Sequence, residues 1–254
     1  MVVQARSIII HQPLLALGEP AKMGVNASVC ATGRTAHGIC FASISGFRRQ
    51  SERLCRPTQH QSWVSRDKKM IEMTYSLKWL TENFERGKRI KYLFFWGHQK
   101  SKSGDLTASC FSQWWTSPFI VDKVKYNTAE HWMMAQKALL FGDQEVYEKI
   151  IVAKSPAEAK TLGRQVRNFD EAIWNSKRFE IVVEGSLQKF TQHQDLKEFL
   201  VNTKERVLVE ASPIDKIWGI GLAADSDKAE NPKRWNGLNL LGFALMEVRD
   251  LLKK

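Results

Sequence analysis

The sequence predicts a mainly α-helical protein with a few short β-strands. The first observation is the segment from Tyr126 to Phe141, whose apolar residues recur mostly three and four positions apart, the spacing of one helix face. The second is a series of helix-start signals after it, such as Ser155 followed by Pro156. The third is a pair of short apolar runs, 92–96 and 206–211, which have the length of strands.

The remaining elements follow from local signals. Spaced apolar residues give the segment 76–86 an amphipathic helical pattern that stops at Gly87. Polar and apolar residues alternate over 121–126, which is typical of a hairpin arm leading into the central helix. The other helices are expected over residues 144–153, 155–166, 171–191 (capped by Asp170), 195–203 (capped by Asp195) and 240–252. About seven helices and no internal repeat predict one compact domain over residues 73–254.

Two ionisable side chains stand inside the apolar central helix. Asn127 is the expected N-cap, and Glu130 follows three residues later, as in a capping box. Glu130 and Lys137 are seven positions apart, about two turns, and therefore share one face of the helix. One interpretation is that Glu130 completes the cap and Lys137 lies at a solvated edge. The other is that Glu130 points into a cleft and does acid–base work.

Charge and cysteine usage narrow the class of protein. Residues 73–254 hold 28 Lys and Arg against 23 Asp and Glu, a mild excess that suits an anionic ligand but equally fits a solvated surface of mixed charge. The four cysteines form no CxxC pair, so neither a disulfide framework nor a zinc site is indicated. A reduced, cytoplasmic setting is expected. No apolar run approaches the roughly 18 residues that a membrane span needs.

Residues 1–72 differ in composition from the rest of the chain. They hold 10 Lys and Arg but only 4 acidic residues, and Ser, Arg, Ala, Gly and Gln are frequent. Three interpretations stay open: a disordered extension, an organelle transit peptide, and sequence upstream of a start at Met70 or Met73. We expect no fold in this basic extension.

Tryptophan is frequent, and several Trp residues are near polar or glycine-rich turns. The chain has nine Trp, of which burial in a core explains about half. The turn around Asp215 and Trp218 places a carboxylate three positions from an aromatic ring. An aromatic face can hold a flat heterocycle while a carboxylate bonds its edge or a sugar hydroxyl. No GxSxG, HExxH or phosphate-loop pattern competes with this candidate site.

A long ordered set of motifs adds to this picture. Its members are Phe111-Ser112, Thr128-Ala129-Glu130-His131 with Ala135-Gln136-Lys137, Leu162-Gly163-Arg164, Trp174, Lys189-Phe190, Asp215 with Trp218-Gly219, Asn239-Leu240-Leu241-Gly242, and Leu245-Met246-Glu247-Val248-Arg249. In this order, and over residues 92–252, the set resembles the YbiA-like, or NADAR, family. The chain departs from the commoner family pattern at Phe95-Trp96, where that pattern has Phe-Tyr, and at FSQWW, where it has FSNF. Both departures fall on the expected wall of the pocket.

The resemblance implies an N-glycosidase with a compact YbiA-like helical fold, without metal or cofactor. Some family members cleave the C–N bond between ribose and the pyrimidine of early riboflavin-biosynthesis intermediates, and this is the function expected here. One alternative is an ADP-ribosyl glycohydrolase acting on ADP-ribosylated guanine, DNA or NAD-derived compounds. The other is a non-catalytic module that binds ADP-ribose or a nucleotide. The expected partner is a small phosphoribosyl or ADP-ribosyl molecule, and nucleic acid enters only through the first alternative.

The resemblance also assigns site residues. Glu130 matches the family's catalytic glutamate, and Trp174, Asp215 and Trp218 match its other active-site positions. We therefore expect the catalytic residues to be Glu130, Asp215 and Trp174. The expected substrate-binding residues are Trp218, Arg164, Lys137, Phe111 and Gly219.

A mechanism for breaking a ribose–nitrogen bond can be written with these residues. The sugar develops oxocarbenium character, so the enzyme must stabilise positive charge and activate a water. Glu130 is the expected base or electrostatic stabiliser, and Asp215 the sugar or water contact that could exchange roles with it. Trp174 and Trp218 would hold the heterocycle or ribose and exclude water. The cations expected at a 5′-phosphate or diphosphate are Arg164 and Lys137.

Overall fold

The computed structural model describes residues 73–253. The extension expected over residues 1–72 lies outside the described residues. Seven α-helices, two 3-10 turns and four short strands make up the described part of the chain, which confirms the mainly helical fold class. No helix in this range is long and apolar enough to cross a membrane.

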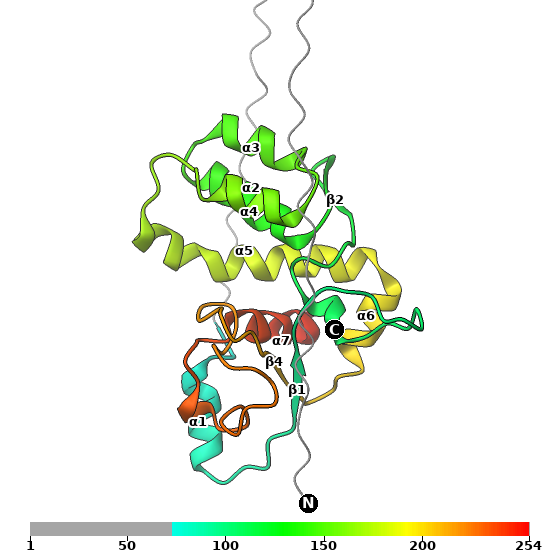
Figure 1. Cartoon of the computed structure of the whole chain (residues 1–254), viewed down its shortest axis with the longest axis vertical. Coiled ribbons are helices and arrows are strands. Elements are labelled where there is room, and N and C mark those ends of the chain that lie inside the picture. Colours follow the sequence, from blue (N-terminus) through cyan, green and yellow to red (C-terminus); the bar gives the residue numbers. More distant parts are fainter. Residues whose placement is uncertain (1–72, 254) are drawn as a thin grey trace, which may run out of the picture. The chain divides into compact units, whose positions relative to one another are not determined.

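A long helix, α5, runs across the middle of the domain, and the other elements pack on its two sides (Figure 1). The helices on one side are α2 (Ala129–Leu140), α3 (Gln144–Ile151) and α4 (Pro156–Gly163). The elements on the other side are α1 (Leu77–Glu85), β1 (Tyr92–Phe95), β4 (Val207–Glu210) and α7 (Leu240–Leu252). Helix α5 (Glu171–Gln192) therefore connects the two halves, and α6 (Gln194–Val201) follows it directly.

The four strands form two small sheets. Strands β1 and β4 are parallel, with Tyr92 opposite Val207 and Phe95 opposite Glu210. The connection between them contains α2 to α6, as a parallel crossover requires a long segment. Strands β2 (Phe119–Val121) and β3 (Val124–Tyr126) form a hairpin that leads into α2. The single arm expected over 121–126 is wrong in extent, because Asp122 and Lys123 form the turn between the two strands.

Several helix boundaries differ from the expectation by one to three residues. The N-cap of α2 is Thr128, whose hydroxyl accepts the backbone N–H of His131, so the expected cap at Asn127 is wrong by one residue. Asp195 lies inside the first turn of α6, because the N-cap position is taken by His193. Helix α4 ends at Gly163 rather than near residue 166. The expected caps Ser155 and Asp170 are confirmed.

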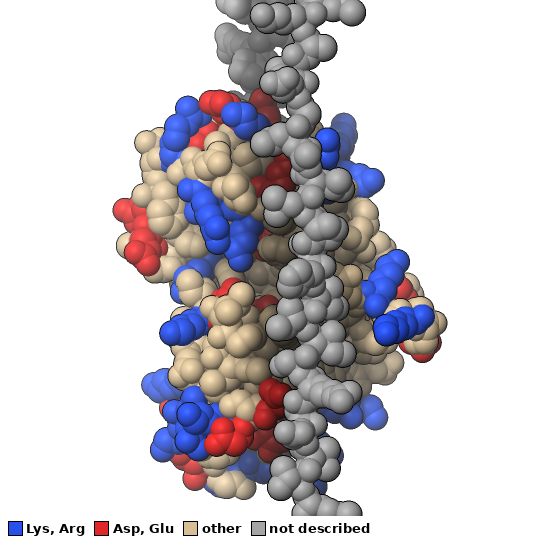
Figure 2. Space-filling model, in the orientation of Figure 1, with Lys and Arg blue, Asp and Glu red and all other residues tan. Residues whose placement is uncertain are grey.

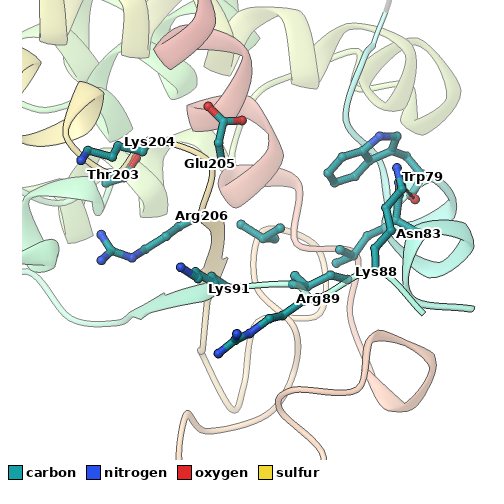
Figure 3. Close-up of a pocket in the computed structure, with 12 residues that line it drawn as sticks. Trp79, Asn83, Lys88, Arg89, Lys91, Thr203, Lys204, Glu205 and Arg206 are labelled. Carbon is teal, nitrogen blue, oxygen red and sulfur yellow. Dashed lines mark hydrogen bonds between the residues drawn. The ribbon is translucent and has the colours of Figure 1, made fainter. Parts of the chain in front are cut away.

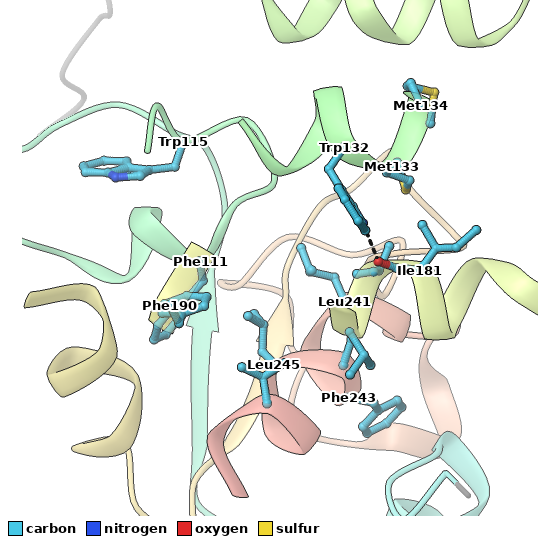
Figure 4. Close-up of a cluster of buried hydrophobic side chains, with 14 of the residues drawn as sticks. Phe111, Trp115, Trp132, Met133, Met134, Ile181, Phe190, Leu241, Phe243 and Leu245 are labelled. Carbon is cyan, nitrogen blue, oxygen red and sulfur yellow. Dashed lines mark hydrogen bonds between the residues drawn. The ribbon is translucent and has the colours of Figure 1, made fainter. Parts of the chain in front are cut away.

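The core is continuous across α2, α5 and α7, and aromatic side chains fill much of it (Figure 4). Trp132 of α2 is 1% exposed, and its indole N–H donates to the Ile181 carbonyl of α5 at 2.8 Å. Gly185 permits this packing, since a Cβ there would be 2.2 Å from the Trp132 ring. Gly163 does the same for α4, where a Cβ would be 2.1 Å from the Met134 sulfur. These contacts fix the distance of α2 from α4 and α5, and α2 carries Glu130.

Candidate functional site

A cleft of about 870 Å³ opens where α2, α4 and the start of α5 meet the segments that follow β1 and β4. Figure 2 shows acidic side chains inside a hollow in the middle of this face, with Lys and Arg side chains beside it over the α4 region. Six predicted site residues line the cleft: Glu130, Lys137, Arg164, Trp174, Asp215 and Trp218. The structure thus brings together residues that are up to 88 positions apart in the chain, from 130 to 218.

Glu130 lies at the start of α2 and is only 3% exposed. Its backbone N–H donates to the Gln113 carbonyl at 3.0 Å, which ties α2 to the loop that carries Trp114. The cap belongs to Thr128, and the Glu130 Oε1 atom has no hydrogen-bond partner in the protein. Of the two interpretations of Glu130, the structure therefore supports the carboxylate in a cleft and contradicts the capping box.

Burial dominates the proton affinity of Glu130. Loss of water raises its pKa from 4.5 to about 7, and the Asp215 charge acts in the same direction. Lys160 is the strongest influence that lowers this pKa, followed by a hydrogen bond from the Trp114 side chain. A carboxyl group with a pKa near neutrality can both accept and return a proton in a reaction at physiological pH.

A second acid, Glu210, is half-buried at the carboxyl end of β4 and lines the same cleft. Its Oε2 atom has no hydrogen-bond partner in the protein. Burial, together with the negative charges of Asp215 and Glu130, raises the pKa of Glu210 to about 8. Glu210 is therefore suited to carry a proton at neutral pH, while Glu130 is suited to lose one first.

Asp215 is the third acid of the cleft, and its surroundings are different. It is half-buried, and one oxygen, Oδ1, accepts the backbone N–H groups of Ile217 and Trp218 at 2.8 Å each. These bonds shape the turn and place the Trp218 ring at the cleft. Its backbone N–H donates to the Ser212 hydroxyl at 3.2 Å. Asp215 thus organises its own loop while it adds negative charge beside Glu130 and Glu210.

Positive charge enters the cleft from the last turn of α4. Arg164 is exposed at the C-cap of this helix, and Lys160 lies one turn earlier. Lys137 is differently engaged: its amine donates to the Gly163 carbonyl at 2.8 Å and lies 4.1 Å from the centre of the Phe169 ring. Lys137 therefore holds the end of α4 in place. The other cations that line the cleft are Lys160 and Arg164 at the end of α4 and Lys216 in the Asp215 loop.

Aromatic side chains form much of the wall. Trp174 from the first turns of α5 and Trp218 from the Asp215 loop are both half-buried. Trp96 is 59% exposed and Trp114 lies beside Lys160, whose amine is 5.8 Å from its ring centre. The two departures from the commoner family pattern, at Trp96 and in the segment FSQWW, thus do fall on the cleft wall.

Two predicted site residues do not line the cleft. Phe111 is 1% exposed and packs its ring against Phe95, Phe190 and Phe199 in the core. Gly219 is buried, and a Cβ there would be 2.8 Å from the Glu210 carbonyl oxygen. Both positions serve the framework: Phe111 supports the loop before Trp114, and Gly219 lets the Asp215 loop approach β4.

Three residues that bear on the cleft are absent from the predicted site residues. Glu210 and Lys160 line the cleft, and Lys189 entered the sequence analysis only as part of a motif. Lys189 of α5 is fully buried, and its amine donates to the carbonyls of Cys110 and Ser112 at 2.6 and 3.1 Å. Burial lowers its pKa to about 8. This amine holds the backbone of the loop that delivers Gln113 and Trp114, so Lys189 acts on the cleft through that loop. Among residues 73–253, no group of three or more His, Cys, Asp or Glu side chains is arranged to hold a metal ion.

The sequence and the structure were compared with those of known proteins, and both have similar relatives. The model of the NADAR domain family matches residues 94–253. An N-glycosidase of Acanthamoeba polyphaga mimivirus is 44% identical over 63% of this chain and 95% of its own. The N-glycosidase YbiA of Escherichia coli is 32% identical over 57% of this chain and 79% of its own. The NMR structure of Escherichia coli YbiA superposes with a TM-score of 0.49 at 28% identity, covering 65% of this chain and 87% of that one.

One further relative is named for riboflavin biosynthesis. The chloroplastic riboflavin biosynthesis protein PYRR of Zea mays is 32% identical over 50% of this chain, which corresponds to 20% of that longer protein.

Proposed function

Because the chain belongs to the NADAR domain family, we propose that it is an N-glycosidase that hydrolyses the bond between a ribose and a nitrogen heterocycle. The names of two relatives, from mimivirus and from Escherichia coli, support this class of reaction. The observation that carries the proposal is the pair of buried carboxyl groups, Glu130 and Glu210, each with an oxygen left without a partner in one cleft.

Glu130 acts on the sugar side of the bond. As the C1′–N bond breaks, its electron pair goes to the nitrogen and C1′ becomes electron-deficient. The Glu130 carboxylate stabilises this charge and accepts a proton from the water whose oxygen bonds to C1′. Asp215 adds a second negative charge beside the same centre and offers its free oxygen to a ribose hydroxyl or to the water.

Glu210 acts on the leaving nitrogen. The departing heterocycle needs a proton, and the Glu210 carboxyl group holds one at neutral pH because it is buried beside two other acids. Glu130 takes one proton from water and Glu210 gives one to the base, so the site returns to its starting state by moving a proton from Glu130 to Glu210. Two carboxyl groups with separated pKa values are the usual arrangement for glycoside hydrolysis.

The remaining side chains of the cleft fit a phosphorylated nucleoside. Trp174 and Trp218 offer aromatic faces to the heterocycle or ribose and keep water out. Lys160 and Arg164 lie together at one rim and suit a 5′-phosphate, since a guanidinium can bind phosphate in a bidentate way. The cleft volume of about 870 Å³ is in the range of small-molecule sites.

We infer further that the substrate is a phosphoribosylaminopyrimidine of the riboflavin-biosynthesis type. The maize relative named for riboflavin biosynthesis supports this choice. The aromatic wall, with a flat face for a pyrimidine and cations for one phosphate, is consistent with it.

The test is incubation of the purified full chain with a phosphoribosylaminopyrimidine and, in parallel, with an ADP-ribosylated guanine. Release of ribose 5-phosphate from the first, absent in Glu130→Gln, is the expected result. Release of ADP-ribose from the second alone would move the protein to the ADP-ribosyl glycohydrolase class. Binding of either compound without any product, in the parent and the variant alike, would contradict an enzyme.

A further inference from the structure

A second cleft, of about 490 Å³, lies outside the candidate active site and is strongly basic (Figure 3). Five cationic side chains line it, and all five are exposed: Lys88, Arg89, Lys91, Lys204 and Arg206. Within the described residues, Glu205 is the one acid of its lining, and that carboxylate lies 3.5 Å from the Lys253 amine. Trp79 and Asn83 of α1 form the opposite wall. We call this the basic cleft.

The register of the parallel sheet explains why these cations meet. Lys91 directly precedes β1, and Arg206 directly precedes β4. Since Tyr92 is paired with Val207, the two cations lie side by side at the amino ends of neighbouring strands. The backbone bond from Val207 N–H to the Lys91 carbonyl, 2.9 Å long, fixes this junction. Figure 3 shows the charged ends of Lys91, Arg89 and Arg206 directed to the same side.

The same sheet keeps the two clefts apart. The candidate active site uses residues that follow the strands, such as Trp96 and Glu210, whereas the basic cleft uses residues that precede them. Four residues of extended chain separate the two ends, or about 13 Å at the usual rise per residue. A ligand in the basic cleft therefore need not compete with a small molecule in the active site.

Within the part of the chain that the structure describes, the five cations have no neutralising acid. None of them forms an ion pair with any acid in residues 73–253. Exposed like charges at close spacing repel one another, which costs folding free energy. The domain as a whole carries only a small excess of positive charge. The fold concentrates positive charge in one concave place by joining the segment 88–91 to the segment 204–206.

We propose that the basic cleft binds a chain of phosphate groups, such as the backbone of a single-stranded nucleic acid or the polyphosphate of a nucleotide. Spaced Lys and Arg side chains in a groove are the usual means of following a phosphate backbone. The Trp79 ring at the opposite wall offers a face on which a base can stack. The basic cleft and the candidate active site lie at opposite ends of the β1–β4 sheet. The basic cleft would hold a phosphate chain while the active site works on a small molecule or on the end of that chain.

The test measures binding of a short labelled single strand, about 12 nucleotides long, by fluorescence anisotropy to the full chain. The triple variant Arg89→Ala/Lys91→Ala/Arg206→Ala is compared with Lys102→Ala/Lys125→Ala/Lys154→Ala, which removes the same charge from exposed positions outside both clefts. We expect the first variant to bind the strand at least about tenfold more weakly. The plot of the logarithm of its binding constant against the logarithm of salt concentration should be less steep by about 2, since three phosphate contacts are lost. The control should change little.

Two competitors identify the source of the phosphates. Displacement of the strand by ATP or by inorganic tripolyphosphate at equal phosphate concentration would identify a free polyphosphate as the ligand. Resistance to both would identify the strand itself. Equal weakening in both triple variants, or no saturable binding by the parent chain, would overturn the proposal. Because none of the three residues touches the candidate active site, hydrolysis of the small substrate by the first variant should be unchanged, which separates this test from that of the proposed function.

Discussion

Glu130 and Glu210 enter one cleft from different elements, and each leaves one carboxylate oxygen buried without a hydrogen-bond partner. An unpaired buried acid costs free energy of folding, so a pair of them in the same cleft indicates a use beyond stability. The Asp215 charge raises the pKa of both acids, and the Glu130 charge also raises that of Glu210. The first three predictions concern this pair.

The first prediction concerns Glu130→Gln. Turnover should fall by roughly two to four decades, the usual scale for one acid–base or electrostatic group. The melting temperature should hold or rise, because the amide removes a buried charge. Single-turnover hydrolysis, a melting curve and a binding titration on one preparation give the three readouts. The surface variant Glu148→Gln on α3 is the control, and full turnover in Glu130→Gln would rule out the assigned role.

The second prediction separates the roles of the two acids by pH. The rate should rise as Glu130 ionises near pH 7 and fall as Glu210 loses its proton near pH 8, which gives a narrow optimum between them. Glu210→Gln should lose the alkaline limb. It should also cost much less with a leaving group that departs without a proton, such as a nitrophenolate. An alkaline limb that persists in Glu210→Gln would assign the general acid to another group.

The third prediction concerns stability. The pKa of Glu210 is about 8 in the folded chain against 4.5 in the unfolded one, so the folded state holds an extra proton between these values. The contribution of Glu210 to stability is therefore fully present below pH 4.5 and is lost as pH rises toward 8. Glu210→Gln does not titrate, so its melting temperature relative to the parent should increase across this window. A constant difference from pH 4.5 to 8 would contradict the buried, protonated state of Glu210.

The fourth prediction concerns the rim cations. Arg164→Ala should raise KM for a 5′-phosphorylated substrate much more than for its dephosphorylated analogue, because the guanidinium contacts the phosphate. The double variant with Lys160→Ala should widen that gap. Lys154→Ala, an exposed charge just before α4 and outside the cleft, serves as the matched control. Equal losses for both substrates would make Arg164 a structural residue.

The helices, the hairpin and most of the cleft could be predicted from the sequence, since helix caps, apolar periodicity and the ordered motifs are local signals. The cap of α2 shows the limit of such signals: Asn127 and Thr128 are both good N-caps, and a shift of one residue moves Glu130 out of the capping position. Glu210 could not be found this way, because a strand buried on both faces has no alternation to mark its last residue.

The roles of Lys137 and of the cations in the basic cleft could not be predicted from the sequence either, because their neighbours come from distant parts of the chain. The partner of Lys137 is a backbone carbonyl 26 positions away, at Gly163, and nothing near Lys137 in the sequence announces it. The basic cleft joins two short segments that become neighbours only when β1 pairs with β4. The signal that could have pointed to Glu210 is its place directly after the apolar run Val207–Val209, at the carboxyl end of a parallel strand, where ligand sites concentrate.

The pairing of β1 with β4 joins segments that are synthesised far apart in time, which affects how the chain folds. Tyr92 meets Val207 only after α2 to α6 have been synthesised, and closing so long a loop slows folding. A ribosome-bound chain that ends before β4 lacks Glu210, Asp215 and one side of each cleft, although its helices around α2 can already pack. Neither cleft is complete before residues in the last fifth of the chain, 203–218, have emerged.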